Sequence, residues 1–181
     1  MRSDRVLYLL GSAAPPVFDV RPVIGQAQAA GWDVCLGLTS TAADWLAGDL
    51  AELEELTGHP IRHRHRTPEE ADPWPPATVA LIAPATFNTI NSWALGLTSE
   101  WVVAFASEAV GRGLPLVMMP CVNTGLTGHP QFDRSIGTLR GAGVRVLLGE
   151  GAFVPDAPKQ SDRTTYPWSA ALAAVAEAAG W

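Results

Sequence analysis

Five short segments of the chain are almost entirely apolar, and stretches with helical spacing separate them. The apolar segments are Val6–Leu10, Trp32–Leu38, Val79–Ala83, Leu116–Met119 and Val144–Leu148. Their side chains do not alternate between apolar and polar, which is typical of strands in a parallel sheet that helices cover on both faces. Strands and helices that alternate over short links predict a doubly wound, three-layer α/β fold.

The order of the segments predicts one Rossmann- or flavodoxin-like domain over residues 1–181, with about five to six strands. Helices are expected from about residue 17 to 30, from 39 to 56 and from 131 to 141, and a C-terminal helix is expected within 168–181. Two segments interrupt the alternation. Residues 59–77 contain a weak strand candidate at 60–62, and the Gly/Pro-rich residues 149–167 are interpreted as a lid or a flexible segment.

Composition and charge narrow the function. A chain of 181 residues with 48% hydrophobic and 17% charged residues has the composition of a globular domain. Its net charge of -6 argues against a nucleic-acid-binding surface. The basic run at residues 62–66 is followed by acidic residues, and we interpret it as a solvated loop. The apolar run Val6–Leu10 is too short for a signal-peptide core or a membrane span, so we expect a cytoplasmic protein without a membrane partner.

Small and hydroxyl-bearing residues follow the first two predicted strands. Gly11-Ser12 ends the first strand and Thr39-Ser40 ends the second. Ligands of doubly wound sheets bind beyond the carboxyl ends of the strands, and such turns can hold a phosphate through amide and hydroxyl donors. Helix capping without a ligand accounts for each turn alone equally well.

The turns after the third and fourth strands carry asparagines. Residues 84–91 read Pro-Ala-Thr-Phe-Asn-Thr-Ile-Asn, in which Asn88, Thr89 and Asn91 can hydrogen-bond the edge of a heterocycle. Residues 120–124 read Pro-Cys-Val-Asn-Thr and place Asn123 at the same edge of the predicted sheet. A structural turn does not need this density of amides and hydroxyls, so the segment predicts a ligand site.

The segment from Pro84 to Thr89 resembles the Pro-Ala-Ser/Thr-x-Asn-Thr motif of the homo-oligomeric flavin-containing cysteine decarboxylases. This family includes phosphopantothenoylcysteine decarboxylase and enzymes that decarboxylate the C-terminal cysteine of peptide antibiotics. Residues 120–123 resemble its Pro-x-Met-Asn motif, with Val122 in place of methionine. The resemblance covers roughly residues 5 to 150.

The resemblance implies an FMN-dependent lyase that acts on a small-molecule or peptide thiol. The flavin takes a hydride from a cysteine side chain, and the resulting thioaldehyde loses carbon dioxide. Asn123 is implied to bind the substrate carboxylate. The resemblance further implies a homo-oligomer, a trimer or a dodecamer, with FMN at subunit interfaces. The implied FMN contacts are Gly11, Ser12, Thr39 and Ser40 around the phosphate, and Pro84, Ala85, Thr86, Asn88 and Thr89 along the ring and ribityl chain.

The catalytic histidine of this family has no clear counterpart in the sequence. His63 and His65 lie closest to its expected place upstream of the third strand, and His65 is the candidate; a solvated histidine in a charged loop is the alternative. No cysteine follows Cys121, which we interpret as a small residue at a strand end. Two other functions therefore stay open: an FMN-binding oxidoreductase or regulatory flavoprotein without decarboxylase activity, and a nucleotide-binding or interaction domain without flavin.

Overall fold

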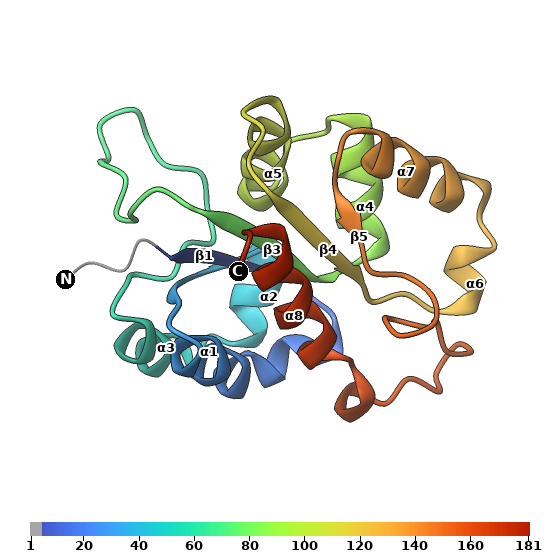
Figure 1. Ribbon diagram of the computed structural model, residues 1–181, viewed down its shortest axis with the longest axis horizontal. Coiled ribbons are helices and arrows are strands. Elements are labelled where there is room, and N and C mark those ends of the chain that lie inside the picture. Colours follow the sequence, from blue (N-terminus) through green and yellow to red (C-terminus); the bar gives the residue numbers. More distant parts are fainter. Residues whose placement is uncertain (1–4) are drawn as a thin grey trace.

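The computed structural model describes residues 5–181, and residues 1–4 lie outside it. Its centre is a five-stranded sheet in the order β2-β1-β3-β4-β5, in which every neighbouring pair is parallel (Figure 1). This is the order of a flavodoxin-like sheet, so the predicted doubly wound fold is confirmed. The strands are β1 (Val6–Gly11), β2 (Asp33–Leu38), β3 (Val79–Ala85), β4 (Leu116–Pro120) and β5 (Arg145–Val146).

Helices cover both faces of the sheet. On one face lie α1 (Val20–Ala29) and α8 (Trp168–Ala178), and on the other lie α4 (Phe87–Leu95), α5 (Trp101–Gly111) and α7 (Pro130–Gly141) (Figure 1). Strands β1, β3 and β4 are buried along their whole length, as their continuously apolar sequences predict. No helix among residues 5–181 is long and apolar enough to cross a membrane.

Several predicted bounds were wrong. The helix expected from 17 to 30 is a 3-10 helix, η1 (Pro15–Asp19), followed by α1. The helix expected from 39 to 56 is two helices, α2 (Ser40–Trp45) and α3 (Leu50–Thr57), because the turn through Gly48 interrupts it. The fifth strand has only two residues. The strand candidate at 60–62 makes a single parallel bridge, between Gly37 and Arg62.

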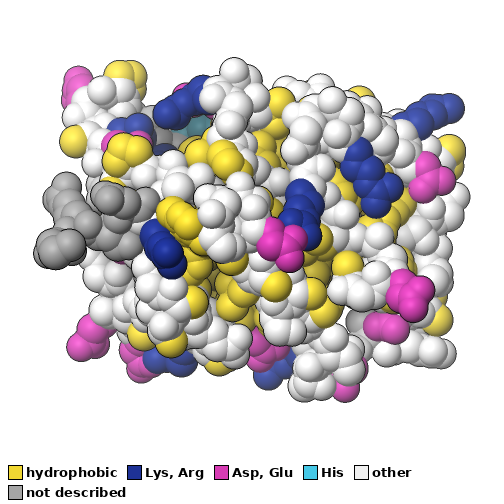
Figure 2. Space-filling model, in the orientation of Figure 1, with side chains coloured by type: hydrophobic (Ala, Val, Ile, Leu, Met, Phe, Trp, Pro, Cys, Tyr) yellow, Lys and Arg dark blue, Asp and Glu magenta, His cyan; other side chains and the backbone are white. Residues whose placement is uncertain are grey.

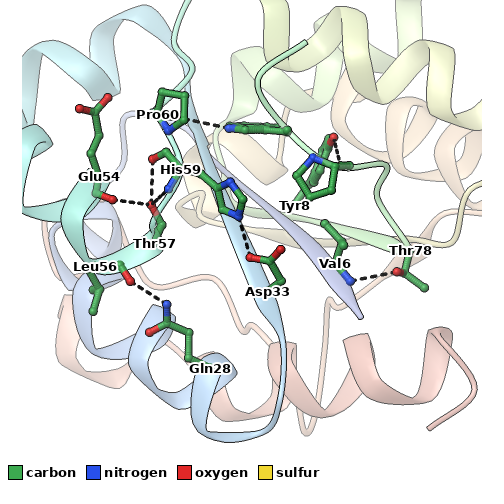
Figure 3. A network of polar contacts seen from close by, with 12 residues as sticks. Val6, Tyr8, Gln28, Asp33, Glu54, Leu56, Thr57, His59, Pro60 and Thr78 are labelled. Atoms are coloured by element: carbon green, nitrogen blue, oxygen red, sulfur yellow. Dashed lines mark hydrogen bonds and ion pairs between the residues drawn. The ribbon is translucent and has the colours of Figure 1, made fainter. Parts of the chain in front are cut away.

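The start of segment 59–77 is fastened to β2 and to the helices beside it (Figure 3). The Nε2 of His59 lies 2.7 Å from Oδ1 of Asp33, and the Oγ1 of Thr57 donates to the carbonyl oxygen of His59 at 3.0 Å. The Nε2 of Gln28 donates to the carbonyl oxygen of Leu56 at 2.7 Å. These bonds fix the point at which the chain leaves α3.

The end of the same segment is fastened to β1 (Figure 3). The Tyr8 hydroxyl donates to the carbonyl oxygen of Pro75 at 2.7 Å, and the amide of Val6 donates to Oγ1 of Thr78 at 2.9 Å. Segment 59–77 is therefore an ordered excursion tied to the sheet at both ends.

The interpretation of residues 62–66 as a solvated loop was wrong for Arg62. Its guanidinium lies 4.2 Å from the ring centre of Trp101, and its side chain is only 14% exposed. Arg64 and Arg66 are exposed and pair with Glu70 and Asp72. On the face in Figure 2 the basic side chains are scattered among apolar and uncharged groups and form no continuous patch.

A candidate cofactor site at the carboxyl edge of the sheet

The turns that follow β1, β2, β3 and β4 meet at one edge of the sheet, because all its strands run parallel. Two adjoining cavities of about 460 Å³ and 360 Å³ lie there and share Ala13, Thr86 and Asn88. We call them together the carboxyl-edge groove. Its lining residues are Ala13, Ala14, Pro15, Thr39, Thr41, Trp45, Thr86, Phe87, Asn88, Thr89, Ser92, Ser99, Glu100, Val103, Cys121, Val122, Asn123, Leu126, Phe153 and Ser161.

The turn after β1 supports the groove from beneath. A side chain at Gly11 would bring a Cβ to 3.2 Å from Val17 and 3.3 Å from Leu38, so glycine allows these two side chains to pack closely against the turn. The amide of Ser12 donates to the carbonyl oxygen of Pro84 at 2.9 Å. The Ser12 hydroxyl lies 2.8 Å from Oγ1 of Thr89, and both residues are buried. Ser12 therefore joins the turn after β1 to the start of α4.

The turn after β3 presents Asn88 to the groove. Thr86 is the N-cap of α4, and its Oγ1 accepts from the amide of Thr89 at 3.3 Å. This cap fixes the first helical turn, where Asn88 is exposed and lines both cavities. Within residues 5–181 the side chain of Asn88 makes no hydrogen bond to another residue. Its amide is thus available to a ligand.

Three predicted ring contacts are buried or turned elsewhere. Pro84 and Ala85 are buried in β3 and do not line the groove. Asn91 faces α7, where its Oδ1 accepts from the hydroxyl of Ser135 at 2.8 Å. Pro84 therefore contributes its carbonyl to Ser12, and Asn91 contributes to helix packing.

The turn after β2 holds two hydroxyls in different ways. Thr39 is the N-cap of α2, and its Oγ1 accepts from the amide of Ala42 at 3.4 Å. The hydroxyl of Ser40 donates to Oε1 of Glu100 at 2.6 Å, and its amide donates to Oε2 of Glu100 at 3.0 Å. Both donors of Ser40 are therefore held by one carboxylate of the chain itself.

Asn123 stands at the other end of the groove. It is half-buried and is the N-cap of α6 (Thr124–Thr127), with its Oδ1 accepting from the amide of Leu126 at 3.1 Å. The oxygen of the side chain is thus bonded within the protein, and its Nδ2 group is left to donate to a ligand. An orientation fixed in this way suits recognition of an anion such as a carboxylate.

Part of segment 149–167 packs over this end of the groove. Phe153 and Ser161 contribute to the lining, and the amide of Thr124 donates to the carbonyl oxygen of Asp156 at 2.8 Å. The buried hydroxyl of Tyr166 donates to the carbonyl oxygen of Met119 at 2.8 Å, which ties the segment to β4. These contacts place part of the segment over this end of the groove, and its interpretation as a lid stays a prediction; we call residues 149–167 the lid for short.

Cys121 lies between the groove and the lid. Burial, together with the charge of Asp156, raises the pKa of its thiol to about 11. The thiol is therefore neutral near pH 7, as expected for a packing residue at the end of β4 and not for a nucleophile.

His65 does not join the other predicted site residues. It is exposed, and its Nε2 lies 3.1 Å from the carbonyl oxygen of Ser99. It lines a separate cavity of about 470 Å³ beside Arg62 and α5. Among residues 5–181 no histidine lines the carboxyl-edge groove. His129, which caps α7 through its Nδ1, contacts only the edge of the site through the ring of Phe87.

Reasoning from the sequence missed Glu100, Phe153 and Ser161. Glu100 binds a residue 60 positions away, and no local pattern reports such a contact. Phe153 and Ser161 belong to the segment interpreted as a lid, but its irregular sequence does not indicate which side chains face inward. Within the described chain no group of three or more His, Cys, Asp or Glu side chains is placed to hold a metal ion.

Comparison with known proteins agrees with this geometry. A protein-family model described as Flavoprotein matches residues 5–172. No curated protein matches the chain. Solved structures with the same fold include the FMN-dependent cysteine decarboxylase SpaF, at 20% identity over 98% of this chain and 99% of that chain with a TM-score of 0.72. TvaF, an FMN-dependent cysteine decarboxylase from thioviridamide biosynthesis, has 17% identity over 98% of this chain and 99% of that chain, with a TM-score of 0.74.

A more distant likeness includes a bound flavin. AnUbiX (PadA1), in complex with FMN and dimethylallyl pyrophosphate, has 11% identity over 78% of this chain and 76% of that chain, with a TM-score of 0.62. At these identities the solved structures show that the fold is shared. The family match covers the groove and the whole of segment 149–167.

Proposed function

The chain belongs to the flavoprotein family, and we propose from this premise that it binds FMN in the carboxyl-edge groove and oxidatively decarboxylates a substrate that ends in cysteine. The single observation that carries the proposal is the placement of Asn88 and Asn123 on one groove, each at the start of a helix that follows a neighbouring strand. The solved cysteine decarboxylases with this fold support the reaction class.

The residues of the groove fit a flavin. Small side chains at Ala13 and Ala14 leave room for a flat ring, and the exposed amide of Asn88 offers both a donor and an acceptor to its edge. Ser12 is buried and does not line the groove, whereas Thr89 lines it, and the contact between their hydroxyls holds the first turn of α4 in place. When bound, FMN would supply the two-electron acceptor that oxidation of a cysteine side chain needs.

Asn123 has a defined part in this proposal. Its Nδ2 group would donate to the carboxylate of the substrate cysteine and orient the bond that breaks. The cysteine side chain would give up a hydride from its Cβ, for which bound FMN would be the acceptor, and a proton from its sulfur to solvent, which would leave a thioaldehyde. The bond between the Cα and the carboxyl carbon would then break, and carbon dioxide would leave. The electron pair of that bond would form an enethiolate, which would take up a proton. Phe153 and Ser161, from the lid, would exclude water from this end of the groove.

A second function is favoured by the position of His65. Because it does not line the groove of its own chain, it could act there only if a second copy brings it to the site. Without such an assembly the chain is an FMN-binding oxidoreductase or regulatory flavoprotein that lacks the decarboxylase histidine.

Exposed apolar side chains, among them the stacked pair Phe18 and Trp45, support a homo-oligomer, which we propose to be a trimer or a dodecamer of this chain.

Synthetic peptides that end in cysteine test the reaction. The FMN-loaded protein in aerated buffer, with dioxygen as the terminal electron acceptor, is expected to give a product lighter by carbon dioxide and two hydrogen atoms, detected by mass spectrometry. A peptide that ends in serine serves as the control. No product from the cysteine peptide, with FMN still bound, would favour the second function. Loss of product in His65→Asn with FMN retained would assign the histidine to the reaction.

Asn123→Asp isolates the proposed carboxylate contact. Aspartate keeps the oxygen that caps α6 at Leu126 but removes the Nδ2 donor and adds a negative charge. Turnover of the peptide is expected to fall by roughly 100-fold or more, because a charge-assisted hydrogen bond is replaced by repulsion. FMN binding and the urea midpoint are expected to stay unchanged. Turnover within a few-fold of the parent protein would remove Asn123 from the site.

A further inference from the structure

Glu100 is the N-cap residue of α5, yet its side chain does not cap that helix. The carboxylate reaches instead to the turn after β2, where it accepts the hydroxyl proton of Ser40 at 2.6 Å and the amide proton of Ser40 at 3.0 Å. A capping role therefore does not explain the geometry of Glu100. Two bonds to one residue hold the carboxylate across the gap between α5 and α2.

Ser40 lies in the turn where the sequence predicts the FMN phosphate; it is not itself a lining residue, but its neighbours Thr39 and Thr41 and its partner Glu100 line the groove. Ser40 is one of the predicted phosphate contacts, and Thr39 beside it uses its own hydroxyl to cap α2. A hydroxyl and an amide that converge on one acceptor suit a phosphate oxygen, and here a carboxylate takes that acceptor position. The structure thus shows an anion on these donors, and the anion comes from the chain.

The charges that line the groove determine how the contact between Glu100 and Ser40 affects an incoming phosphate. Among the lining residues that the structure describes, Glu100 is the only charged side chain, and no arginine or lysine offsets it. A phosphate entering the groove would meet neutral donors and one carboxylate. Two anions cannot share the donors of Ser40, so Glu100 must move away before the phosphate can take its place.

We propose that Glu100 determines the cofactor specificity of the groove: its carboxylate competes with the FMN phosphate for the donors of Ser40 and weakens binding of FMN relative to riboflavin. The inference rests on the proposed flavin site and adds a selectivity element to it. Removal of the negative charge strengthens binding of the phosphorylated flavin and leaves the unphosphorylated flavin unaffected, because the terminal group of riboflavin is a neutral hydroxyl that the carboxylate does not repel.

Titrations of both flavins, followed by quenching of flavin fluorescence, test the competition. Glu100→Gln keeps the size and the acceptor oxygen of the side chain and removes only its charge. Affinity for FMN is expected to rise by about tenfold or more, whereas affinity for riboflavin stays within about twofold. The matched control is Glu108→Gln on the same helix, because Glu108 is exposed, pairs with Arg112 and lies outside the groove. It is expected to change neither affinity.

Ser40→Ala in the Glu100→Gln background separates competition for donors from a general charge effect. Loss of the hydroxyl should then weaken FMN binding and leave riboflavin binding unchanged. Urea denaturation of each variant confirms that it is folded, and Glu100→Asp, which shortens the side chain, provides a second route to withdraw the carboxylate from Ser40.

Three outcomes would overturn the inference. An FMN affinity that stays within twofold in Glu100→Gln would show that the phosphate does not meet this carboxylate. An equal rise for both flavins would show that Glu100 acts on the ring or on the fold. If neither flavin binds any variant, the proposed function fails as well, which distinguishes that result from the first two.

Discussion

The carboxyl-edge groove and the region around Arg62 contrast sharply, although both adjoin α5. Around Arg62 four aromatic residues, Tyr8, Trp74, Trp101 and Phe105, form what we call the aromatic cluster. Tyr8 and Trp74 lie 4.7 Å apart and Trp74 and Trp101 5.6 Å apart, in edge-to-face contacts. Arg62 stacks on Trp101. The groove, in contrast, is lined by a mixture of small, hydroxyl-bearing and apolar side chains, and Asn88 presents an exposed amide to it.

The two regions also satisfy their polar atoms differently. In the aromatic cluster the two indole N–H groups donate to the carbonyl oxygens of Leu38 and Pro60, both at 2.9 Å, and burial raises the pKa of Tyr8 well above its usual value. In the groove the hydroxyls bond to one another and to helix ends, and Asn88 stays open. Rings with satisfied polar atoms stabilise a fold, whereas an open amide held in place is suited to a ligand. The contrast predicts that substitutions in the two regions change different measurements.

The largest effect is expected from Trp74→Ala. Trp74 is 5% exposed and contacts Tyr8, Trp101 and Arg62, so its removal leaves a cavity in the core. The free energy of unfolding is expected to fall by about 3–5 kcal/mol, measured by urea denaturation. FMN affinity of the folded protein is expected to stay the same. Leu97→Ala is the control, because Leu97 is 57% exposed, lies outside both the aromatic cluster and the groove, and its truncation should cost less than about 1 kcal/mol. Equal losses for the two variants would contradict the comparison.

Asn88→Asp should produce the reverse pattern. It replaces the amide N–H donor with a charge at an exposed position that lines both cavities, so the fold should keep its stability to within about 0.5 kcal/mol. FMN affinity is expected to fall by roughly 100-fold, measured by fluorescence titration. Asn91→Ala, on the side of α4 that faces Ser135, is the control: it removes the acceptor of the Ser135 hydroxyl and should destabilise the protein without affecting FMN. Unchanged FMN affinity in Asn88→Asp would remove the strongest residue from the proposed site.

A smaller effect is expected where the fold supports the groove. Ser12→Ala removes the buried hydrogen bond to Thr89 and should lower the free energy of unfolding by about 1 kcal/mol. FMN affinity should also fall by a few-fold, because the first turn of α4 loses one of its anchors. Ser135→Ala removes a buried hydroxyl bonded to Asn91 on the far side of α4 and should cost similar stability with no change in FMN affinity. If both serines behave alike, Ser12 has no special relation to the groove.

The smallest effect concerns Cys121. Its pKa is raised to about 11 in the folded protein, above the ordinary value of 9.0, so the unfolded state loses the thiol proton first as the pH rises. The contribution of this thiol to stability is therefore present below pH 9 and is lost between about pH 9 and 11. In the native protein Cys121 should react slowly with iodoacetamide at pH 8 and faster as the pH approaches 11. Rapid labelling at pH 8 that FMN does not slow would place the thiol outside the protected edge of the groove.

The sequence predicted what depends on local pattern. Continuous apolar runs located the strands, and the hydroxyls before a helical stretch located Thr39, whose oxygen caps α2. The cap of α4 at Thr86 was not predicted, because the residues after the third strand were interpreted only as ligand contacts. Since parallel strands end at one edge, the positions of the strands also predicted that the turns would meet. The break between α2 and α3 was missed because the apolar spacing continues through the turn around Gly48.

Contacts between distant segments could not be predicted in this way. Arg62 stands in a charged run, and only the fold shows that its guanidinium stacks on Trp101. The hydroxyl of Tyr166 bonds to Met119, 47 residues earlier, and fixes where the lid meets β4. The hold of Glu100 on Ser40 likewise depends on where α5 begins relative to β2. Such contacts decide which predicted donors are available to a ligand, and the motif alone does not reveal them.

Flavin absorbance of the protein after loading with FMN and desalting tests the central claim most directly. The account predicts that the flavin bands remain with the protein and that Asn88→Asp loses them under the same conditions, with its fold intact by circular dichroism. A protein that is colourless after loading at high FMN concentration would contradict the account, because the groove would then lack the ligand that its asparagines and hydroxyls are proposed to bind.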